Sequence, residues 1–420
     1  MREAFRSLTT RGRAFLAAGL TAGICAVLLG QDDLLRVAAL LAVLPVVAAW
    51  LTARRRDRLS LRRHVAPDRI TVGQEAAVTL TVVNGGAGAV GSLLLEEQVP
   101  FTLGSRPRFL VPRIEGNHAV DLVYRVRPEL RGRYPLGPLR VRVDDPFGML
   151  ELSRTFHRTE HVTVLPPVEA LPAIGLGGGA SGSGDHRTRA FAVGSAEDVT
   201  VRDYRRGDDL RRVHWRSSAR VGELMVRREE QPWESRATVL LDNRAGAHAG
   251  TGALSSFETA VRAAASVGSH LAALGHQVDL VTSAGRLHAG PPHPAHDRGR
   301  AGDTRQLLDS LAVIATHDTA RWEAAAAEEL RPGGIVVAVL GSVHEPDRRA
   351  LARLRQHAGT ALAIVLDTPA WAGAARAHAP DGDGVATWLG TQGWRAVVAG
   401  PRDRLPEVWR ELGATAGARR

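Results

Sequence analysis

Two apolar runs near the beginning of the chain limit most strongly what it can fold into. The first extends from Ala14 to Gly30 and the second from Leu34 to about Ala53, with Asp32 and Asp33 in the short break between them. Each run approaches the roughly 20 residues that a helix needs to cross the hydrocarbon layer. A basic segment before an apolar run is also the pattern of a signal peptide. Because the second run follows at once, with no clear cleavage site before it, the sequence favours a transmembrane helical hairpin.

Basic residues flank the outer ends of these runs, whereas the break between them is acidic. Lysine and arginine collect on the cytoplasmic side of membrane proteins, so this asymmetry predicts both ends of the hairpin, and the rest of the chain, in the cytoplasm. We therefore expect residues 1–60 to form a two-helix anchor of a multi-pass cell-membrane protein. The arginines are Arg2, Arg6, Arg11 and Arg13 before the first run, and Arg54, Arg55, Arg56, Arg58, Arg62 and Arg63 after the second.

Residues 61–170 change to short segments of alternating apolar and polar residues. Examples are Ala77–Val83, Ala119–Tyr124 and Leu139–Val143, separated by turn formers such as those at 84–86 and 115–117. Many short strands at near-regular spacing are typical of an all-β sandwich of immunoglobulin or fibronectin type. A Gly/Ser-rich linker at 171–190 follows, and its glycines lack the Lys-Ser/Thr of a phosphate loop.

Residues 236–420 alternate predicted strands with predicted helices. Apolar strands are expected at 237–241, 277–282, 335–340, 361–366 and 395–398, and the longest helix at 256–274. Units of this size predict an α/β domain with a mostly parallel, Rossmann-like sheet that is covered by helices. Asp242 and Asp367 directly follow two of these strands.

The densest charge cluster, DYRRGDDLRRVHWRSSAR at 203–220, lies between the two predicted domains, within a segment at 191–235. Asp208 is placed to cap a short helix on which Leu210, Val213, His214 and Ser217 share one face. Three interpretations remain open: an internal clasp between domains, a recognition surface for an acidic partner, and catalysis. Catalysis has the least support, because the one histidine has no nucleophile partner at a spacing that would indicate a catalytic pair. The candidate contact residues are Tyr204, Arg205, Arg206, Asp208, Arg211, Trp215 and Arg220.

These residues carry a family resemblance. The order Tyr204, Gly207-Asp208, Arg211, Trp215 and Arg220 closely resembles the signature of the bacterial family called domain of unknown function 58. The stretch RGRYPLGPLRVRVDDPFGML at 131–150 also matches that family. We expect its Asp145-Pro146-Phe147-Gly148 element to be a turn whose phenylalanine plugs one end of the sandwich.

The resemblance implies that the α/β domain is of the von Willebrand factor A type. The metal site of such domains begins with Asp-x-Ser-x-Ser after the first strand. Here the residues are Asp242-Asn243-Arg244-Ala245-Gly246, so both serines are lost and an arginine replaces one of them. Because Arg244 can offer its own positive charge to Asp242, we predict a degenerate site that holds no metal, and no cofactor.

The resemblance further implies protein partners, because such proteins are commonly encoded beside MoxR-type AAA+ ATPases and transglutaminase-like membrane proteins. We therefore expect a membrane-anchored, non-enzymatic scaffold or adaptor. Two alternatives remain: a metal-dependent hydrolase that uses Asp242, Asp367 and His214, and a basic nucleic-acid-binding protein. The net charge of +10 is weak support for the latter, because the arginines are spread along the whole chain.

Overall fold

The computed structural model of the chain describes residues 8–54, 59–144, 148–149, 151–176, 201–203, 215–227, 236–283, 285–288, 301–319, 322, 333–372 and 382–414. The chain divides into two compact units. The first comprises Met1–Glu169 together with His248–Ser266 and Arg305–His317, and the second comprises Ala170–Ala247, Val267–Thr304 and Asp318–Arg420.

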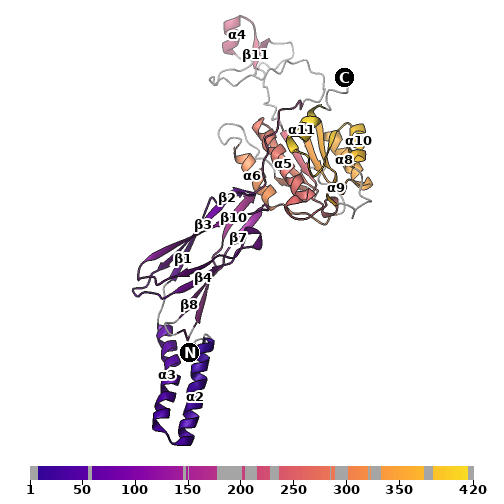
Figure 1. Cartoon of the computed structure of the whole chain (residues 1–420). Coiled ribbons are helices and arrows are strands. Elements are labelled where there is room, and N and C mark those ends of the chain that lie inside the picture. The colour runs from indigo at the N-terminus through magenta and orange to yellow at the C-terminus, as the bar shows by residue number, and fades with distance from the viewer. Residues whose placement is uncertain are drawn as a thin grey trace. The chain divides into compact units, whose positions relative to one another are not determined.

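The two apolar runs form a pair of adjacent helices, α2 (Thr10–Leu29) and α3 (Asp32–Arg54), which are labelled in Figure 1. The helix α2 begins where the Thr9 hydroxyl oxygen accepts the Gly12 amide, and it ends at Gly30, whose φ of 65° suits glycine. By length and composition, α2 is a helix that could cross a membrane. This finding is consistent with membrane association.

Small residues allow the two helices of the hairpin to pack closely. A Cβ atom added at Gly19 would lie 2.9 Å from the Ala42 amide nitrogen and 3.1 Å from the Ala38 carbonyl oxygen. Glycine and alanine at such contacts are the usual basis of helix association in membranes.

We expect Gly19→Leu to force the helices apart and to lower the stability of the hairpin by about 1–3 kcal/mol, the usual cost of overpacking. Hydrogen exchange of α2 in nanodiscs measures this effect. Ala18→Leu is the matched control, because Ala18 is exposed on the same helix. Equal exchange in the two variants would contradict the close packing at Gly19.

The sandwich has strands in three sheets, with the orders β1-β3-β6, β2-β10-β7 and β5-β4-β8-β9. Alternating side chains enter one apolar core, as in β3, where every second residue is buried. The bounds are β1 (Leu59–Ala66), β2 (Arg69–Thr71), β3 (Ala76–Asn84), β4 (Leu93–Glu97), β5 (Arg108–Val111), β6 (Ala119–Val126), β7 (Gly132–Leu136), β8 (Leu139–Asp144), β9 (Glu151–Phe156) and β10 (Glu160–Leu165), with the 3-10 turn η1 (Phe101–Leu103).

Two arginines of the basic flank, Arg62 and Arg63, lie in the first strand of the sandwich. Arg63 lies in β1, and its Nη2 is 2.6 Å from the Glu97 Oε1 atom of β4. Both side chains are almost fully buried. The local sequence does not indicate that Arg63 is buried, because a buried arginine needs a carboxylate partner and that partner, Glu97, lies on another strand.

The turn between β8 and β9 contacts the start of α2. The Thr9 hydroxyl donates to the Gly148 carbonyl at 2.7 Å, and the Thr9 amide donates to the Met149 carbonyl at 2.9 Å. The end of the predicted Asp-Pro-Phe-Gly turn, at Gly148, is therefore hydrogen-bonded to the N-cap residue of α2. The predicted plug, Phe147, lies outside the described residues, as do Asp145 and Pro146.

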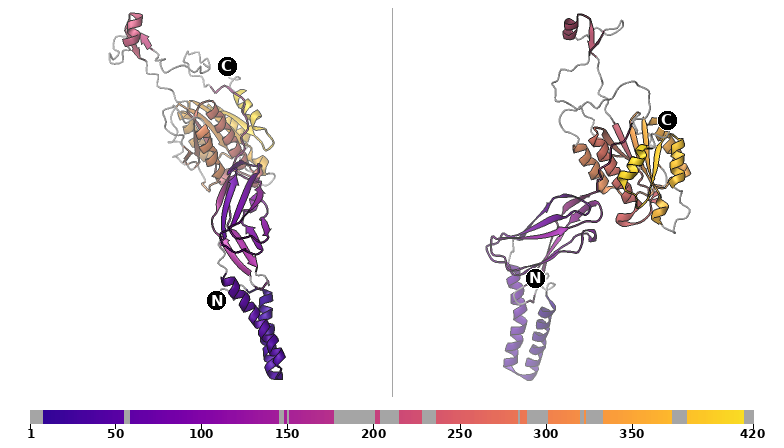
Figure 2. Two further views of the ribbon diagram at one scale, coloured as in Figure 1. Left: turned by 90° about the vertical axis from the view of Figure 1, so that its left-hand side faces the viewer. Right: turned by 45° about the horizontal axis from the view of Figure 1, so that its top comes forward.

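The α/β region contains a six-stranded sheet with the order β15-β14-β13-β16-β17-β18. All neighbours pair in parallel except β15, which is antiparallel to β14. Figure 2 shows helices on both faces of this sheet. The bounds are β13 (Arg236–Leu241), α5 (Ser256–Ala273), β14 (Gln277–Thr282), β15 (Gly285–His288), α6 (Ala301–Val313), β16 (Ile335–Leu340), α8 (Glu345–His357), β17 (Thr360–Leu366), α9 (Thr368–Ala372), α10 (Gly382–Thr391), β18 (Arg395–Ala399) and α11 (Leu405–Ala414), with the short 3-10 turns η3 (Ala245–Ala247) and η4 (Gly252–Leu254).

A small module precedes this sheet in the sequence. It consists of β11 (Val201–Asp203), α4 (Trp215–Val221) and β12 (Met225–Arg227), with β11 and β12 antiparallel. The Ser218 side chain is buried and its Oγ accepts the Met225 amide at 2.8 Å, which fixes α4 against β12. The predicted helix start at Asp208 lies outside the described residues.

Candidate functional site

The order of the parallel strands reverses between β13 and β16, because β14 lies on one side of β13 and β16 on the other. In open α/β sheets, ligands bind beyond the carboxyl ends of the strands at such a reversal. Asp242 directly follows β13, and Gly341-Ser342 directly follows β16. Neighbouring strands thus place a carboxylate and a Gly-Ser segment together at the position where a site is expected.

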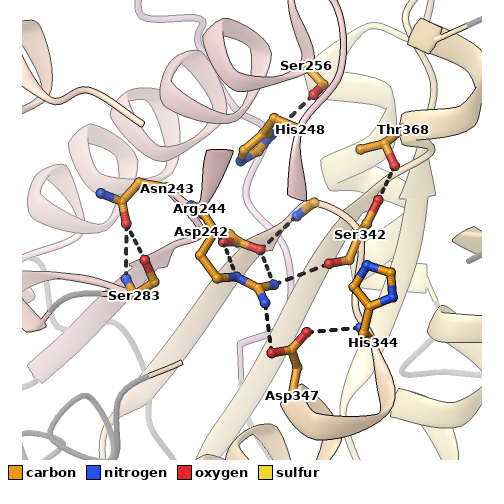
Figure 3. Close-up of polar contacts among 11 residues, drawn as sticks. Asp242, Asn243, Arg244, His248, Ser256, Ser283, Ser342, His344, Asp347 and Thr368 are labelled. Carbon is orange, nitrogen blue, oxygen red and sulfur yellow. Dashed lines mark hydrogen bonds and ion pairs between the residues drawn. The ribbon is translucent and has the colours of Figure 1, made fainter. Parts of the chain in front are cut away.

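An arginine occupies this position. Arg244 Nε and Nη2 donate to the two carboxylate oxygens of Asp242 at 2.9 and 2.8 Å, and Nη1 donates to Asp347 Oδ1 at 2.7 Å. Nη2 also donates to the Ser342 carbonyl at 3.2 Å. Figure 3 shows the guanidinium between the two carboxylates. We call Asp242, Arg244 and Asp347 the arginine brace.

The brace is closed to solvent. The exposed fractions of the side chains are 3% for Arg244, 0% for Asp242 and 2% for Asp347. Burial by itself lowers the pKa of Arg244, but the hydrogen bonds and charges of Asp242 and Asp347 outweigh it and raise the pKa above its ordinary value. Arg244 therefore stays charged, and its planar fork matches both carboxylates.

Asp347 also caps the N-terminus of α8. Its Oδ2 atom accepts the His344 amide at 2.9 Å, which completes a capping box at the helix N-terminus. The brace consequently joins the end of β13 to the start of α8. The sequence shows no sign of this contact, because Asp347 is far from Arg244 along the chain and resembles an ordinary helix cap.

Other polar side chains near the strand ends also have partners within the fold. Asn243 Oδ1 accepts the amide of Ser283 at 3.2 Å and also its hydroxyl, and the Ser342 hydroxyl is bonded to that of Thr368. In the first compact unit, the buried His248 Nδ1 lies 3.1 Å from Ser256 Oγ, which also accepts the Ala249 amide. Figure 3 draws these pairs. Each of these hydrogen bonds helps to hold its own loop in place.

Of the residues in the alternative hydrolase site, the described structure places Asp242 and Asp367. Both oxygens of Asp242 accept from Arg244. Asp367 follows β17, two strands away from β13 in the sheet, and His214 lies outside the described residues. Within the described ranges, no group of three or more His, Cys, Asp or Glu side chains is placed to hold a metal ion.

The predicted contact residues are described only in part. Trp215 has an exposed fraction of 68% on α4, and Arg220, in the same helix, is also exposed. Val221 and Leu224 add further exposed apolar surface close to them in the sequence. The remaining candidates, Tyr204, Arg205, Arg206, Asp208 and Arg211, lie outside the described residues.

Comparison with known proteins bears on the region around the brace. Residues 200–358 match the model of the family described as protein of unknown function DUF58. The match covers less than half of the chain and shows that this region is similar to the DUF58 family. The matched DUF58 region contains the α4 module and all three residues of the arginine brace, whereas the hairpin and the sandwich precede it.

Other comparisons add little. No curated protein matches the chain. Among solved structures, the CARDB domain of a Pyrococcus furiosus protein is 20% identical, with a TM-score of 0.20, over 26% of this chain and 89% of that one. A cohesin module of a Clostridium perfringens glycoside hydrolase is 15% identical, with a TM-score of 0.20, over 26% and 96%.

Proposed function

We propose that this DUF58 protein is a membrane-anchored, non-enzymatic scaffold or adaptor whose von Willebrand A-like domain uses an arginine in place of a metal ion. The observation that carries the proposal is the arginine brace. Both of its carboxylates are buried and hydrogen-bonded to Arg244, so the guanidinium occupies the place where an ion would be ligated. The proposed role of this position is to fix the loops of a binding domain.

The proposed anchor is the α2–α3 hairpin, with both termini and the folded domains on the cytoplasmic side. Its support is the apolar length of α2 and the arginines on the outer ends of both runs. The acidic residues Asp32 and Asp33 lie at the opposite end, where the hairpin turns.

The proposed contact surface is the α4 module. Tryptophan and arginine dominate the binding energy of protein interfaces more often than other residues, and Trp215 and Arg220 are both exposed on α4. The basic residues around them in the sequence favour an acidic partner surface. We propose a MoxR-type AAA+ ATPase as partner, and a transglutaminase-like membrane protein as a further component.

Crosslinked affinity purification from native membranes tests this proposal. We expect Trp215→Ala to lower the affinity for the partner by about 2 kcal/mol, roughly thirtyfold, as for a hot-spot residue. Arg211→Glu should act in the same direction by reversing a charge. Recovery of the ATPase with the unchanged chain, and its loss in both variants, is the expected result.

Phe101→Ala is the matched control, because Phe101 is an exposed aromatic residue of the sandwich, with an exposed fraction of 91%. Its partner yield should equal that of the unchanged chain. If the same partners are recovered with Trp215→Ala at equal abundance, the α4 module is not the contact surface. If no partner is recovered with any chain, the adaptor function itself is contradicted.

A further inference from the structure

One arginine of the sandwich lies buried among residues from the distant half of the sequence. Arg131 precedes β7, and its side chain has an exposed fraction of 5%. Nη1 and Nη2 donate to the Ile314 carbonyl at 3.1 and 2.9 Å, and Nη2 lies 3.2 Å from Glu258 Oε1. The guanidinium also stands 5.2 Å from the centre of the Phe257 ring. All four residues belong to the first compact unit.

These partners come from the beginning of one helix and the end of another. Phe257 and Glu258 lie in the first turn of α5, and Ile314 directly follows α6. A carboxylate, a carbonyl and an aromatic face are three different groups that one planar guanidinium can satisfy together. Lysine, with a single compact ammonium group, cannot reproduce this arrangement.

The local sequence around Arg131 holds its backbone in place. The Tyr134 hydroxyl donates to the carbonyls of Leu130 and Arg131, at 3.0 and 3.1 Å. The Tyr134 ring lies against Gly132, where an added Cβ atom would be 3.0 Å from the ring. The Arg-Gly-x-Tyr element thus fixes the backbone conformation from which the Arg131 side chain extends.

Two further ion pairs join the sandwich to the same helices. Arg69 of β2 contacts Asp309 of α6 at 2.8 Å. Glu169, after β10, lies 3.5 Å from Arg262 of α5, and its amide donates to Ser266 Oγ at 3.0 Å. These two pairs are about one-third exposed, so they contribute little alone. Arg131 is the buried member of the set.

We propose that Arg131 is a positioning residue that makes the start of α5 and the end of α6 move as one body with the sandwich. This inference concerns the first compact unit alone and does not depend on the membrane or adaptor role.

The test is the distance between two spin labels in the full-length protein in nanodiscs. One replaces Leu110 on β5 and the other replaces Val313 at the end of α6, both of which are exposed, with Cys25 changed to alanine. We expect a narrow distance distribution that becomes at least twice as broad in Arg131→Lys. Arg133→Lys, an exposed neighbour on β7, should leave the width unchanged.

Hydrogen exchange distinguishes positioning from general stability. In Arg131→Lys, the amides at 256–266 and 305–317 should exchange at least about tenfold faster, whereas β3 and β16 should keep their rates. Glu258→Gln preserves the shape and removes the charge, so it should give a smaller increase in the same segments. An unchanged label distribution, or an increase in exchange that spreads equally to β3 and β16, would overturn the proposal.

Discussion

Replacing Arg244 by leucine should lower the free energy of unfolding of the α/β region by about 3–5 kcal/mol, because it leaves two buried carboxylates without their partner. Asp242 and Asp347 have almost no exposed surface, so water cannot replace the guanidinium. Trp322 is a built-in reporter, since its ring centre lies 5.7 Å from the Arg244 guanidinium carbon. Denaturant unfolding followed by tryptophan fluorescence measures the loss.

Two controls separate charge from geometry in this prediction. Arg244→Lys keeps the charge but cannot bond to both Asp242 oxygens and Asp347 together, so its loss should be smaller than that of the leucine variant. Arg349→Leu removes an exposed arginine from α8 and should change stability by less than about 0.5 kcal/mol. A loss below about 1 kcal/mol in Arg244→Leu would mean that the brace does not hold the fold together.

The same position provides a test of whether Arg244 stands in for an ion. Arg244→Ser frees Asp242 and Asp347 and adds a hydroxyl oxygen, which is the kind of ligand that Mg²⁺ and Mn²⁺ accept. We expect millimolar Mg²⁺ or Mn²⁺ to raise the melting temperature of this variant and to leave the unchanged chain unaffected. Equal responses of both chains would contradict the stand-in role.

The sequence allowed much of this region to be anticipated. Short apolar strands that alternate with amphipathic helices predicted the parallel sheet, and the spacing of Asp242 and Arg244 suggested their pairing. The third member of the brace could not be anticipated in the same way. Asp347 joins Arg244 only because β16 lies next to β13, and strand order is a property of the folded sheet.

The sandwich was less predictable for a similar reason. Strands with clear alternation, such as β3 and β6, lie near the positions that the sequence predicts, whereas the predicted strands do not include β1, β5, β7 and β9. The polar residues of β1 include Arg62 and Arg63, which resemble a membrane flank when read along the chain. Their place in a sheet becomes visible only when β3 is paired beside them and Glu97 faces Arg63.

The ion pair between Arg63 and Glu97 gives the second large predicted loss of stability. Replacing Arg63 by methionine should lower the stability of the sandwich by about 3–5 kcal/mol, because Glu97 would remain buried without its partner. A Cβ atom at Gly137 would lie 2.7 Å from Arg63 Nη2, so the guanidinium already fills its space tightly. Hydrogen exchange of β3 and β4 is the appropriate measurement, because all eight tryptophans lie outside the sandwich strands.

The double variant Arg63→Met with Glu97→Leu separates the stability contribution of the ion pair from the contributions of the two side chains. When both charges are replaced by apolar groups, the desolvation cost disappears together with the attraction, so the double variant should be more stable than either single variant. Additive losses would show instead that the two side chains act independently. Arg62→Met, the exposed neighbour on the opposite face of β1, provides the matched control.

The pair also predicts a pH dependence with a definite sign. Burial raises the pKa of Glu97 above 4.5, with the charge of Arg63 acting against it. The native state therefore retains a proton that the unfolded chain has already released, so the contribution of Glu97 to stability falls as the pH rises from about 4.5 through its native pKa. Glu97→Gln removes this dependence. The stability of the unchanged chain, measured relative to this variant, should decrease over that window and be constant on either side. An increase would mean that attraction to Arg63 outweighs the cost of burial.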